Sequence, residues 1–204
     1  MIKKRILVAD DHALFRVGLK ALLSDHPYAE VVGEVDNGLA LFEALKIQQP
    51  DVLILDYEMP NLNGLDALQE IRQRQLPVQV IVLTGASSEL VLREFLAVGV
   101  QGMLYKDDDP QELLLAVNAV LAGEQSFSAT VQAKLEKAQQ LDSLTSRERQ
   151  VIRLIAQGLT NKAIAESTGI AIKTVDNHRT NMMKKLNLHS VAEVVAFANR
   201  MGLG

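Results

Sequence analysis

Short apolar runs alternate with longer segments of helical periodicity through the first 123 residues. The apolar runs cover residues 6–9, 31–32, 52–55, 80–83 and 103–105, and helical patterns follow them at residues 13–24, 39–48, 65–74, 89–98 and 111–122. Continuous apolar runs of this length are typical of strands that are buried on both faces. Five strand–helix repeats therefore predict an α/β domain with a doubly wound, parallel, five-stranded sheet.

Residues 142–204 carry helical patterns only. Capping boxes, in which Thr or Ser is followed three positions later by Glu, open the first and last of these helices at Thr145 and Ser190. Between them stand a short helix, a turn at Gly169 and a longer helix over residues 172–186. This succession is the helix-turn-helix pattern. We therefore predict a small all-α domain of four helices.

Charge is divided unevenly between the two parts of the 204-residue chain. Residues 1–123 carry a net charge of −8, whereas residues 124–204 carry +4. A basic second part suggests a partner that bears phosphates, such as nucleic acid. The polar segment over residues 124–141 has no proline and is expected to link a first domain, 1–123, to a second, 142–204, as a partly helical linker.

The composition removes several function classes. The absence of cysteine excludes disulfide frameworks, Cys-ligated metals and thiol nucleophiles. No apolar stretch approaches the roughly 18 residues that span a bilayer, and the first apolar run is too short for a signal peptide. We therefore expect a cytoplasmic protein with no membrane partner.

Polar side chains follow four of the five predicted strands. Asp10 and Asp11 follow the first strand and Asp56 the third, while Thr84 and Lys106 end the fourth and fifth. The carboxyl ends of parallel strands meet at one edge of a sheet, so these side chains should converge. Three carboxylates repel one another unless a hard cation such as Mg²⁺, or Mn²⁺ in its place, binds them. A carboxylate beside a metal, a hydroxyl and an ammonium is arranged for phosphoryl transfer.

A single Asp at a strand end is explained equally well as a loop or cap residue. Several polar side chains at successive strand ends favour the chemical interpretation. His12 stands alone at the start of a helix, which favours a surface or packing role, and His26 and His189 indicate no function.

Four segments together resemble the receiver domain of bacterial two-component response regulators, over residues 4 to about 123. They are Asp10-Asp11, Asp56-Tyr57-Glu58-Met59-Pro60-Asn61-Leu62-Asn63-Gly64, Thr84-Gly85-Ala86 and the segment from Gly102 to Lys106. The resemblance implies a flavodoxin-like fold and implies that Asp56 accepts a phosphoryl group from a sensor histidine kinase. It further implies that the main-chain carbonyl of Glu58 joins the three aspartates around Mg²⁺, and that Thr84 and Lys106 contact the phosphoryl oxygens.

The sequence departs from the receiver pattern at one position of the switch. Receivers commonly carry an aromatic residue three positions before the lysine, where this chain has Met103, and the aromatic Tyr105 stands next to Lys106 instead. A flexible methionine could repack there, so Thr84, Met103 and Tyr105 are the candidate switch residues. The departure leaves open a transcription factor that binds DNA without phosphorylation.

The predicted helix over residues 172–186 has two distinct faces. Val175, Met182 and Leu186 form an apolar stripe that should pack inward. The opposite stripe is polar and consists of Lys173, Asn177, Thr180, Asn181 and Lys184. Amides and hydroxyls read base edges in a DNA major groove and lysines pair with phosphates, although a solvated helix face alone has the same composition.

Three segments resemble the DNA-binding domain of the LuxR type over residues 142 to about 200. They are Leu144-Thr145-x-Arg147-Glu148, Gly158-Leu159-Thr160-Asn161-Lys162-x-Ile164-Ala165 and Thr174-Val175-x-Asn177-His178. With the receiver, the whole chain resembles the NarL/FixJ class. The resemblance places Asp176, Asn177 and Thr180 at base-reading positions. It makes the following residues candidates for the DNA backbone: Lys162, Lys173, Thr174, His178, Arg179, Lys184 and Lys185.

Two residues depart from the LuxR-type pattern. Asp176 stands where lysine is frequent, and an acid there repels phosphate but can accept a hydrogen bond from cytosine. Ala171 stands where Ser or Thr often caps the recognition helix, and a missing cap costs about 1 kcal/mol.

We therefore expect a transcriptional regulator of double-stranded DNA that is switched by phosphorylation and is not an enzyme with a separate substrate. Leu113, Leu114 and Leu115 are too many adjacent apolar residues for one buried stripe, which suggests a homodimer on phosphorylation. Two rivals remain: a phosphohydrolase with Asp56 as nucleophile, and a ligand-sensing LuxR-type activator, whose first domain would need a deep apolar pocket.

Overall fold

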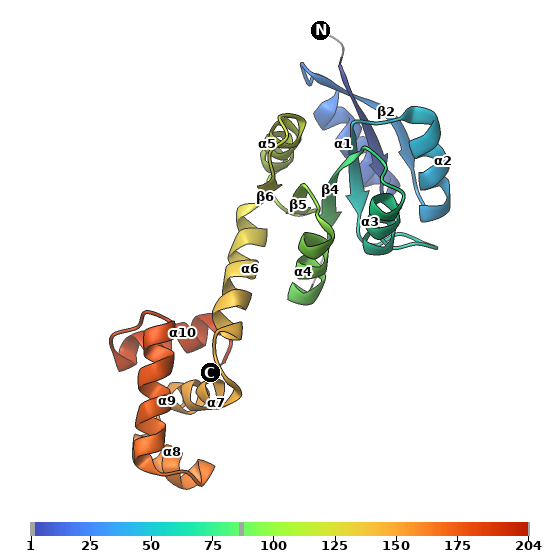
Figure 1. Cartoon of the computed structure of the whole chain (residues 1–204). Coiled ribbons are helices and arrows are strands. Elements are labelled where there is room, and N and C mark those ends of the chain that lie inside the picture. Colours follow the sequence, from blue (N-terminus) through green and yellow to red (C-terminus); the bar gives the residue numbers. More distant parts are fainter. Residues whose placement is uncertain (1–2, 86–87, 204) are drawn as a thin grey trace. The chain divides into compact units, whose positions relative to one another are not determined.

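The computed structural model describes residues 3–85 and 88–203 and divides the chain into two compact units, Met1–Leu135 and Glu136–Gly204 (Figure 1). The helix α6 (Ala129–Asp142) begins in the first unit and ends in the second. Within the described residues, no helix is both long and apolar enough to cross a membrane.

The first unit is built on one parallel sheet with the strand order β2-β1-β3-β4-β5-β6. The strands are β1 (Lys4–Ala9), β2 (Ala29–Val35), β3 (Val52–Asp56), β4 (Gln79–Thr84), β5 (Gly102–Tyr105) and β6 (Ser126–Phe127). The predicted doubly wound parallel sheet is confirmed, but the predicted number of five strands is wrong. The sixth strand pairs Ser126 with Gly102 and Phe127 with Met103 at the edge of the sheet. Two residues carry no periodic pattern, so the sequence placed this segment in the linker.

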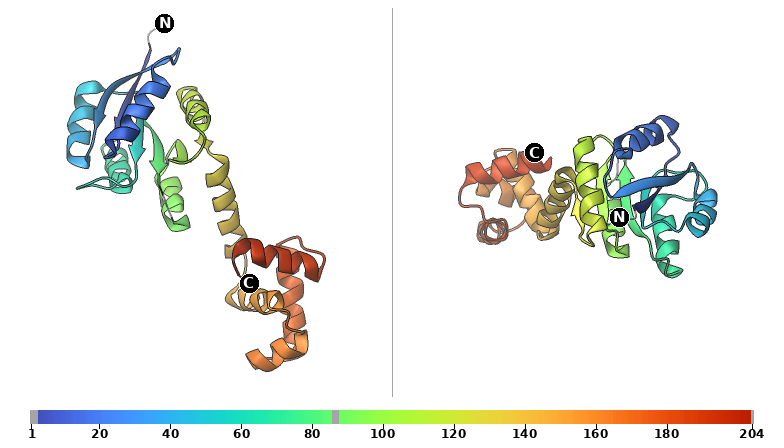
Figure 2. Two further views of the ribbon diagram at one scale, coloured as in Figure 1. Left: turned by 180° about the vertical axis from the view of Figure 1, so that it is seen from behind. Right: turned by 90° about the horizontal axis from the view of Figure 1, so that it is seen from above.

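Helices cover both faces of this sheet (Figure 2). They are α1 (Ala13–Leu23), α2 (Gly38–Gln48), α3 (Gly64–Gln73), α4 (Glu89–Val98) and α5 (Pro110–Leu121). Successive strand residues point to opposite faces: Leu53 and Leu55 lie in the core with α2, α3 and α4, whereas Ile54 lies in the core with α1 and α5. Burial on both faces explains why the central strands are continuously apolar.

The second unit contains α7 (Ser146–Ala156), α8 (Asn161–Thr168), α9 (Ile172–Lys185) and α10 (Val191–Met201). Its core includes Val175 and Met182 on the inner face of α9, as the apolar stripe predicted. Gly169 ends α8 with a φ of 68°, a left-handed conformation that glycine adopts without a steric penalty. The turn therefore brings α9 in at a new angle, and Ala171 begins α9 without a side-chain cap.

Candidate functional site

The carboxyl ends of β1, β3 and β5 bring three charged side chains into contact. Asp10 and Asp56 are both 1% exposed. The Lys106 Nζ atom lies 2.7 Å from Asp56 Oδ2 and 2.8 Å from Asp10 Oδ2. Asp11 lies beside them and is partly exposed to solvent. The structure thus brings together the carboxylates and the ammonium that the strand ends predicted, because parallel strands in adjacent positions end at the same edge.

Thr84 is fully buried at the end of β4, the strand between those that carry Asp56 and Lys106. Its carbonyl oxygen accepts the Lys106 main-chain N–H at 2.9 Å, which fixes where the lysine leaves the sheet. Of the motif that begins at Thr84, Ala86 lies outside the described residues.

Burial and charge pairing oppose each other at this edge. It raises the pKa of Asp56, and repulsion from Asp10 adds to that shift, while the hydrogen bond and charge of Lys106 oppose it. Burial lowers the pKa of Lys106, but its hydrogen bonds and charge pairing with Asp10 and Asp56 outweigh burial and raise it. One lysine faces two buried carboxylates, Asp10 and Asp56, and its single positive charge is shared between them. The cluster is therefore short of positive charge, which is the condition that a bound cation would relieve.

The donor atoms of the cluster suit a divalent cation. One ligand atom each from Asp10, Asp11, His12 and Asp56 lie within 4.8 Å of one another. Carboxylate oxygens are the donors that Mg²⁺ prefers, so the residues fit the ion that the sequence predicted. The Glu58 N–H donates to Asp56 Oδ1 at 3.2 Å, which places the Glu58 main chain beside the cluster; the role of its carbonyl stays a prediction.

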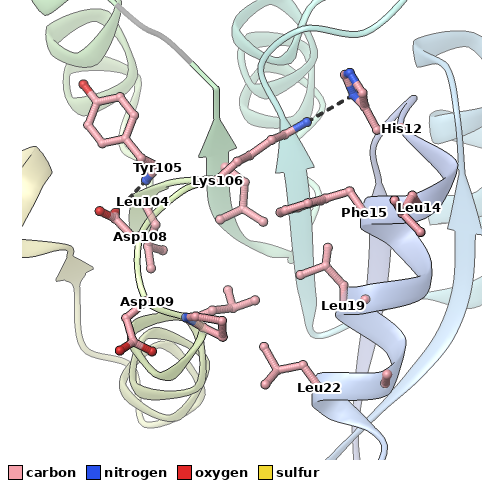
Figure 3. Close-up of a pocket in the computed structure, with 15 residues that line it drawn as sticks. His12, Leu14, Phe15, Leu19, Leu22, Leu104, Tyr105, Lys106, Asp108 and Asp109 are labelled. Atoms are coloured by element: carbon pink, nitrogen blue, oxygen red, sulfur yellow. Dashed lines mark hydrogen bonds between the residues drawn. The ribbon is translucent and has the colours of Figure 1, made fainter.

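The sequence predicts a surface or packing role for His12, and the structure places the residue at the surface, beside the carboxylates. Its side chain is 62% exposed, yet Nδ1 lies 2.7 Å from Asp11 Oδ1 and 3.2 Å from Asp10 Oδ1. The same atom lies 3.4 Å from Lys106 Nζ (Figure 3). The signal in the sequence was the position of His12 directly after the two aspartates, which fixed its main chain at the same edge.

The loop after β3 leaves no space for a side chain at Gly64. A Cβ atom there would lie 2.3 Å from the Asp56 carbonyl oxygen and 2.9 Å from the Tyr57 Cα atom. The Gly64 N–H donates to the Tyr57 carbonyl at 2.8 Å, which draws the two segments together. This close approach holds the main chain of Asp56 where its side chain can face the cluster.

The candidate switch residues lie in different surroundings. Met103 is fully buried in β5. Tyr105 is 8% exposed, its hydroxyl has no hydrogen-bond partner in the described chain, and its ring centroid lies 5.4 Å from Lys134 Nζ in α6. The contact between Tyr105 and α6 was not visible in the sequence, because Lys134 follows almost thirty residues later, in a segment that was expected to be part of a linker.

A groove of about 710 Å³ opens beside the cluster, between α1 and the start of α5 (Figure 3). Phe15, Leu19, Leu22 and Leu113 contribute to its apolar wall, and Lys106 stands at one end with its Nζ 5.0 Å from the Phe15 ring centroid. The groove therefore presents an apolar surface next to the acidic edge, which is the end of the sheet that carries Asp10, Asp11 and Asp56.

The second unit presents the polar face of α9 to solvent. Of the predicted DNA-contacting residues, Lys162, Lys173, Asp176, Asn177, Thr180 and Lys184 are exposed, and Thr174, His178 and Arg179 are half-buried. Asn161 of α8 donates a hydrogen bond to Asp176, and Arg179 donates to the Asn161 amide oxygen at 3.5 Å. Asp176 therefore also holds the two helices of the helix-turn-helix together, a role that the sequence did not reveal.

Lys185 has a partner inside the protein. Its Nζ donates to Glu148 Oε2 at 2.7 Å. Glu148 is 3% exposed and forms the predicted capping box with Thr145, in which each main-chain N–H donates to the other side chain, at 2.8 and 3.2 Å. The glutamate therefore connects the start of α7 to the end of α9.

We expect Glu148→Gln to lower the stability of the second unit by about 1.5–3 kcal/mol at pH 7, the range for a hydrogen bond to a charged group. Burial raises the pKa of Glu148, but the bonds from Lys185 and Thr145 outweigh it and hold the pKa below its ordinary 4.5. A depressed pKa gives stability that is present above pH 4.5 and is lost as pH falls through the pKa of the folded state. The difference between wild type and variant should shrink below pH 4.5.

Urea unfolding of the full chain, followed by hydrogen exchange in peptides of α7 and α10, measures this difference at each pH. Glu193→Gln is the matched control, since the Glu193 N–H also donates to the helix-capping hydroxyl, that of Ser190, while the exposed Glu193 side chain accepts from His189 and Ser190 rather than from a lysine. An equal loss of unfolding free energy in the two variants would show that the contact of Glu148 with Lys185 adds nothing to stability.

Comparison with known proteins covers both units. Residues 6–118 match the family described as "Response regulator receiver domain", and residues 142–198 match "Bacterial regulatory proteins, luxR family". The receiver match overturns the rival interpretation of a ligand-sensing first domain. The nitrate/nitrite response regulator protein NarL of Escherichia coli K12 is 35% identical over 96% of this chain and 94% of its own length.

Three further similarities extend over nearly the whole chain. The virulence factors putative positive transcription regulator BvgA of Bordetella pertussis is 32% identical over 98% of each chain. A structure of the RcsB response regulator of Salmonella typhimurium has a TM-score of 0.69 and 27% identity, over 98% of this chain and 100% of that one. A complex of RcsB with DNA has a TM-score of 0.64 and 26% identity, over 97% and 98%.

Proposed function

The chain belongs to the NarL/FixJ class of two-component response regulators, which are DNA-binding transcriptional regulators, and we propose which of its residues carry the phosphoryl chemistry. Asp56 accepts the phosphoryl group, and Thr84 and Lys106 bind its oxygens. The observation that carries this assignment is the position of Lys106 Nζ, within 2.8 Å of both buried carboxylates, Asp56 and Asp10.

The donor of the phosphoryl group is a phosphohistidine of a sensor histidine kinase. A carboxylate oxygen of Asp56 attacks phosphorus, the new O–P bond forms as the P–N bond breaks, and the imidazole leaves with the electron pair. Lys106 keeps Asp56 ionised for the attack and then neutralises a phosphoryl oxygen. Water later hydrolyses the acyl phosphate to the Asp56 carboxylate and inorganic phosphate. The domain therefore acts only on its own phosphoryl group and has no separate substrate.

Asp10, Asp11 and Asp56 would hold Mg²⁺, or Mn²⁺, together with the main-chain carbonyl of Glu58. When bound, the ion supplies positive charge to the carboxylates and to the phosphoryl oxygens. Asp10 and Asp56 are both buried and share one lysine, which leaves net negative charge at this edge and supports the assignment.

The second domain binds double-stranded DNA through the exposed face of α9. Asp176, Asn177 and Thr180 face base edges in the major groove, where an amide suits adenine and a carboxylate suits cytosine. The residues proposed for the backbone are Lys162, Lys173, Thr174, His178, Arg179 and Lys184, with Lys185 when it is released from Glu148. The similarity to RcsB, which is known in complex with DNA, supports this proposal.

Phosphorylation produces a homodimer that binds two half-sites. Leu113 is buried and Leu114 partly buried, whereas Leu115 is 61% exposed on α5, which leaves one apolar residue of the three for a partner. Two RcsB dimers have been seen on DNA, which supports the same arrangement. We place the functional domains at 1–123 and 142–204, with 124–141 as the connecting segment.

The switch passes from Thr84 along β5 to α6. Buried Met103 repacks when Thr84 moves, and Tyr105, which touches Lys134 of α6, carries the change out of the receiver. The alternative is constitutive DNA binding with a degenerate switch, which the absence of an aromatic residue at Met103 favours.

DNA binding of the full chain with and without beryllofluoride and Mg²⁺, at one fixed salt concentration, tests the switch. We expect about tenfold tighter binding to two half-sites with the analogue, because a second linked contact adds avidity. Sedimentation should show the dimer under the same conditions. An equal affinity for DNA and an equal sedimentation mass with and without beryllofluoride would favour constitutive DNA binding.

A further inference from the structure

We propose that His12 supplies a nitrogen ligand to the cation site, so that the site binds divalent transition ions such as Co²⁺ in preference to Mg²⁺. The inference rests on the proposed function, in which the acidic edge holds a divalent cation. It adds a residue that the assignment to Asp10, Asp11, Asp56 and Glu58 does not contain.

The position of the imidazole supports a ligand role. His12 Nδ1 lies 2.7 Å from Asp11 Oδ1, 3.2 Å from Asp10 Oδ1 and 3.9 Å from Asp56 Oδ2. An octahedral ion with bonds of about 2.1 Å separates adjacent ligand atoms by about 3.0 Å and opposite ones by about 4.2 Å. The nitrogen therefore already stands at the spacing of a ligand in the same coordination shell.

The protein holds His12 in this place by its main chain. The His12 N–H donates to Asp10 Oδ1 at 2.8 Å, so the residue is tied to the carboxylate whose other oxygen pairs with Lys106. His12 is also the cap residue of α1, but its side chain does not cap the helix. The ring is instead turned toward the carboxylates, and its exposure leaves it room to adjust to an ion.

The identity of the ligand decides the preference among metals. Mg²⁺ prefers oxygen ligands and gains little from an imidazole. Imidazole suits the later first-row ions, whose affinity for nitrogen ligands rises from Mn²⁺ through Co²⁺ to Ni²⁺. A site of three carboxylates and one imidazole should therefore bind Co²⁺ more tightly than a site of carboxylates alone, with little change for Mg²⁺.

The test is calorimetric titration of the full chain with CoCl₂ and, separately, with MgCl₂, for wild type and His12→Gln. We expect the substitution to weaken Co²⁺ binding at least about tenfold, which is the lower end of the loss in metal affinity when groups around the metal ligands are replaced. The affinity for Mg²⁺ should change less than about twofold. The visible absorption of bound Co²⁺ should change with the loss of nitrogen. His189→Gln, at an exposed histidine in the second unit, is the matched control and should change neither.

Each outcome is informative. An unchanged Co²⁺ affinity in His12→Gln, or an equal loss for both ions, overturns the inference while the proposed Mg²⁺ site stands. Tighter binding of either ion in His12→Gln also overturns it, since the imidazole then competes with the ion for Asp11. If wild type binds neither ion, the proposed metal site fails together with the inference. The Mg²⁺ titration also shows that the variant is folded, because the carboxylates keep their positions only in the folded sheet.

Discussion

Asp56→Asn should abolish phosphorylation of the full chain by acetyl phosphate and Mg²⁺. The oxygen of an amide is a much weaker nucleophile than a carboxylate oxygen. Among the described residues, Asp10 is the one other buried carboxylate that pairs with Lys106. The loss of the charge should not lower the melting temperature, because it removes the repulsion between Asp56 and Asp10 and leaves Lys106 with one partner. Intact mass spectrometry measures the phosphoryl adduct, with a chelator as the second negative control.

Asp51→Asn is the matched control for this substitution. Asp51 precedes the other end of β3, where it accepts hydrogen bonds from Lys4 and from the Arg5 main chain. The variant should gain the adduct at the rate of wild type. A persistent adduct in Asp56→Asn would identify another carboxylate as the acceptor. A folded wild type that gains no adduct would require the test to be repeated with its kinase.

Gly64→Ala should lower the free energy of unfolding of the receiver by at least about 3 kcal/mol, the upper end of the cost of an overpacked site. The added Cβ would stand 2.3 Å from the Asp56 carbonyl oxygen, and both close neighbours are main-chain atoms that cannot rotate away. The main chain of the acceptor would have to shift, so the rate of phosphorylation should fall as well. Urea unfolding with hydrogen exchange in β3 peptides measures the first effect.

Gly18→Ala tests the same change where space exists. Gly18 lies within α1, and a Cβ there meets no atom within 4 Å. Alanine is about 1 kcal/mol better than glycine in a helix interior, so this variant should be more stable than wild type. A similar loss at Gly18 and Gly64 would show that the close approach at Gly64 has no special cost.

The sequence alone was sufficient to predict most of the fold and the convergence of charged side chains at the acidic edge. Apolar runs such as Val52–Leu55 can only be buried on both faces, so parallel strands covered by helices followed directly. Parallel topology then placed Asp10, Asp56 and Lys106 at one edge, although they are far apart in the chain. The two stripes of α9 followed from helical periodicity in the same way.

Only the tertiary structure decided the contacts that depend on which surfaces meet. The strand β6 has two residues and pairs with the edge strand β5, so no local sequence pattern predicted it. His12 has an ordinary helix-start position, and its contact with the carboxylates of Asp10, Asp11 and Asp56 depends on the strand ends that the fold brings together. Asp176 and Lys185 fit the DNA-contacting pattern by type, but their partners Asn161 and Glu148 come from other helices. Sequence periodicity determines which side of an element is buried, whereas the partner of a polar side chain depends on distances between elements that only packing sets.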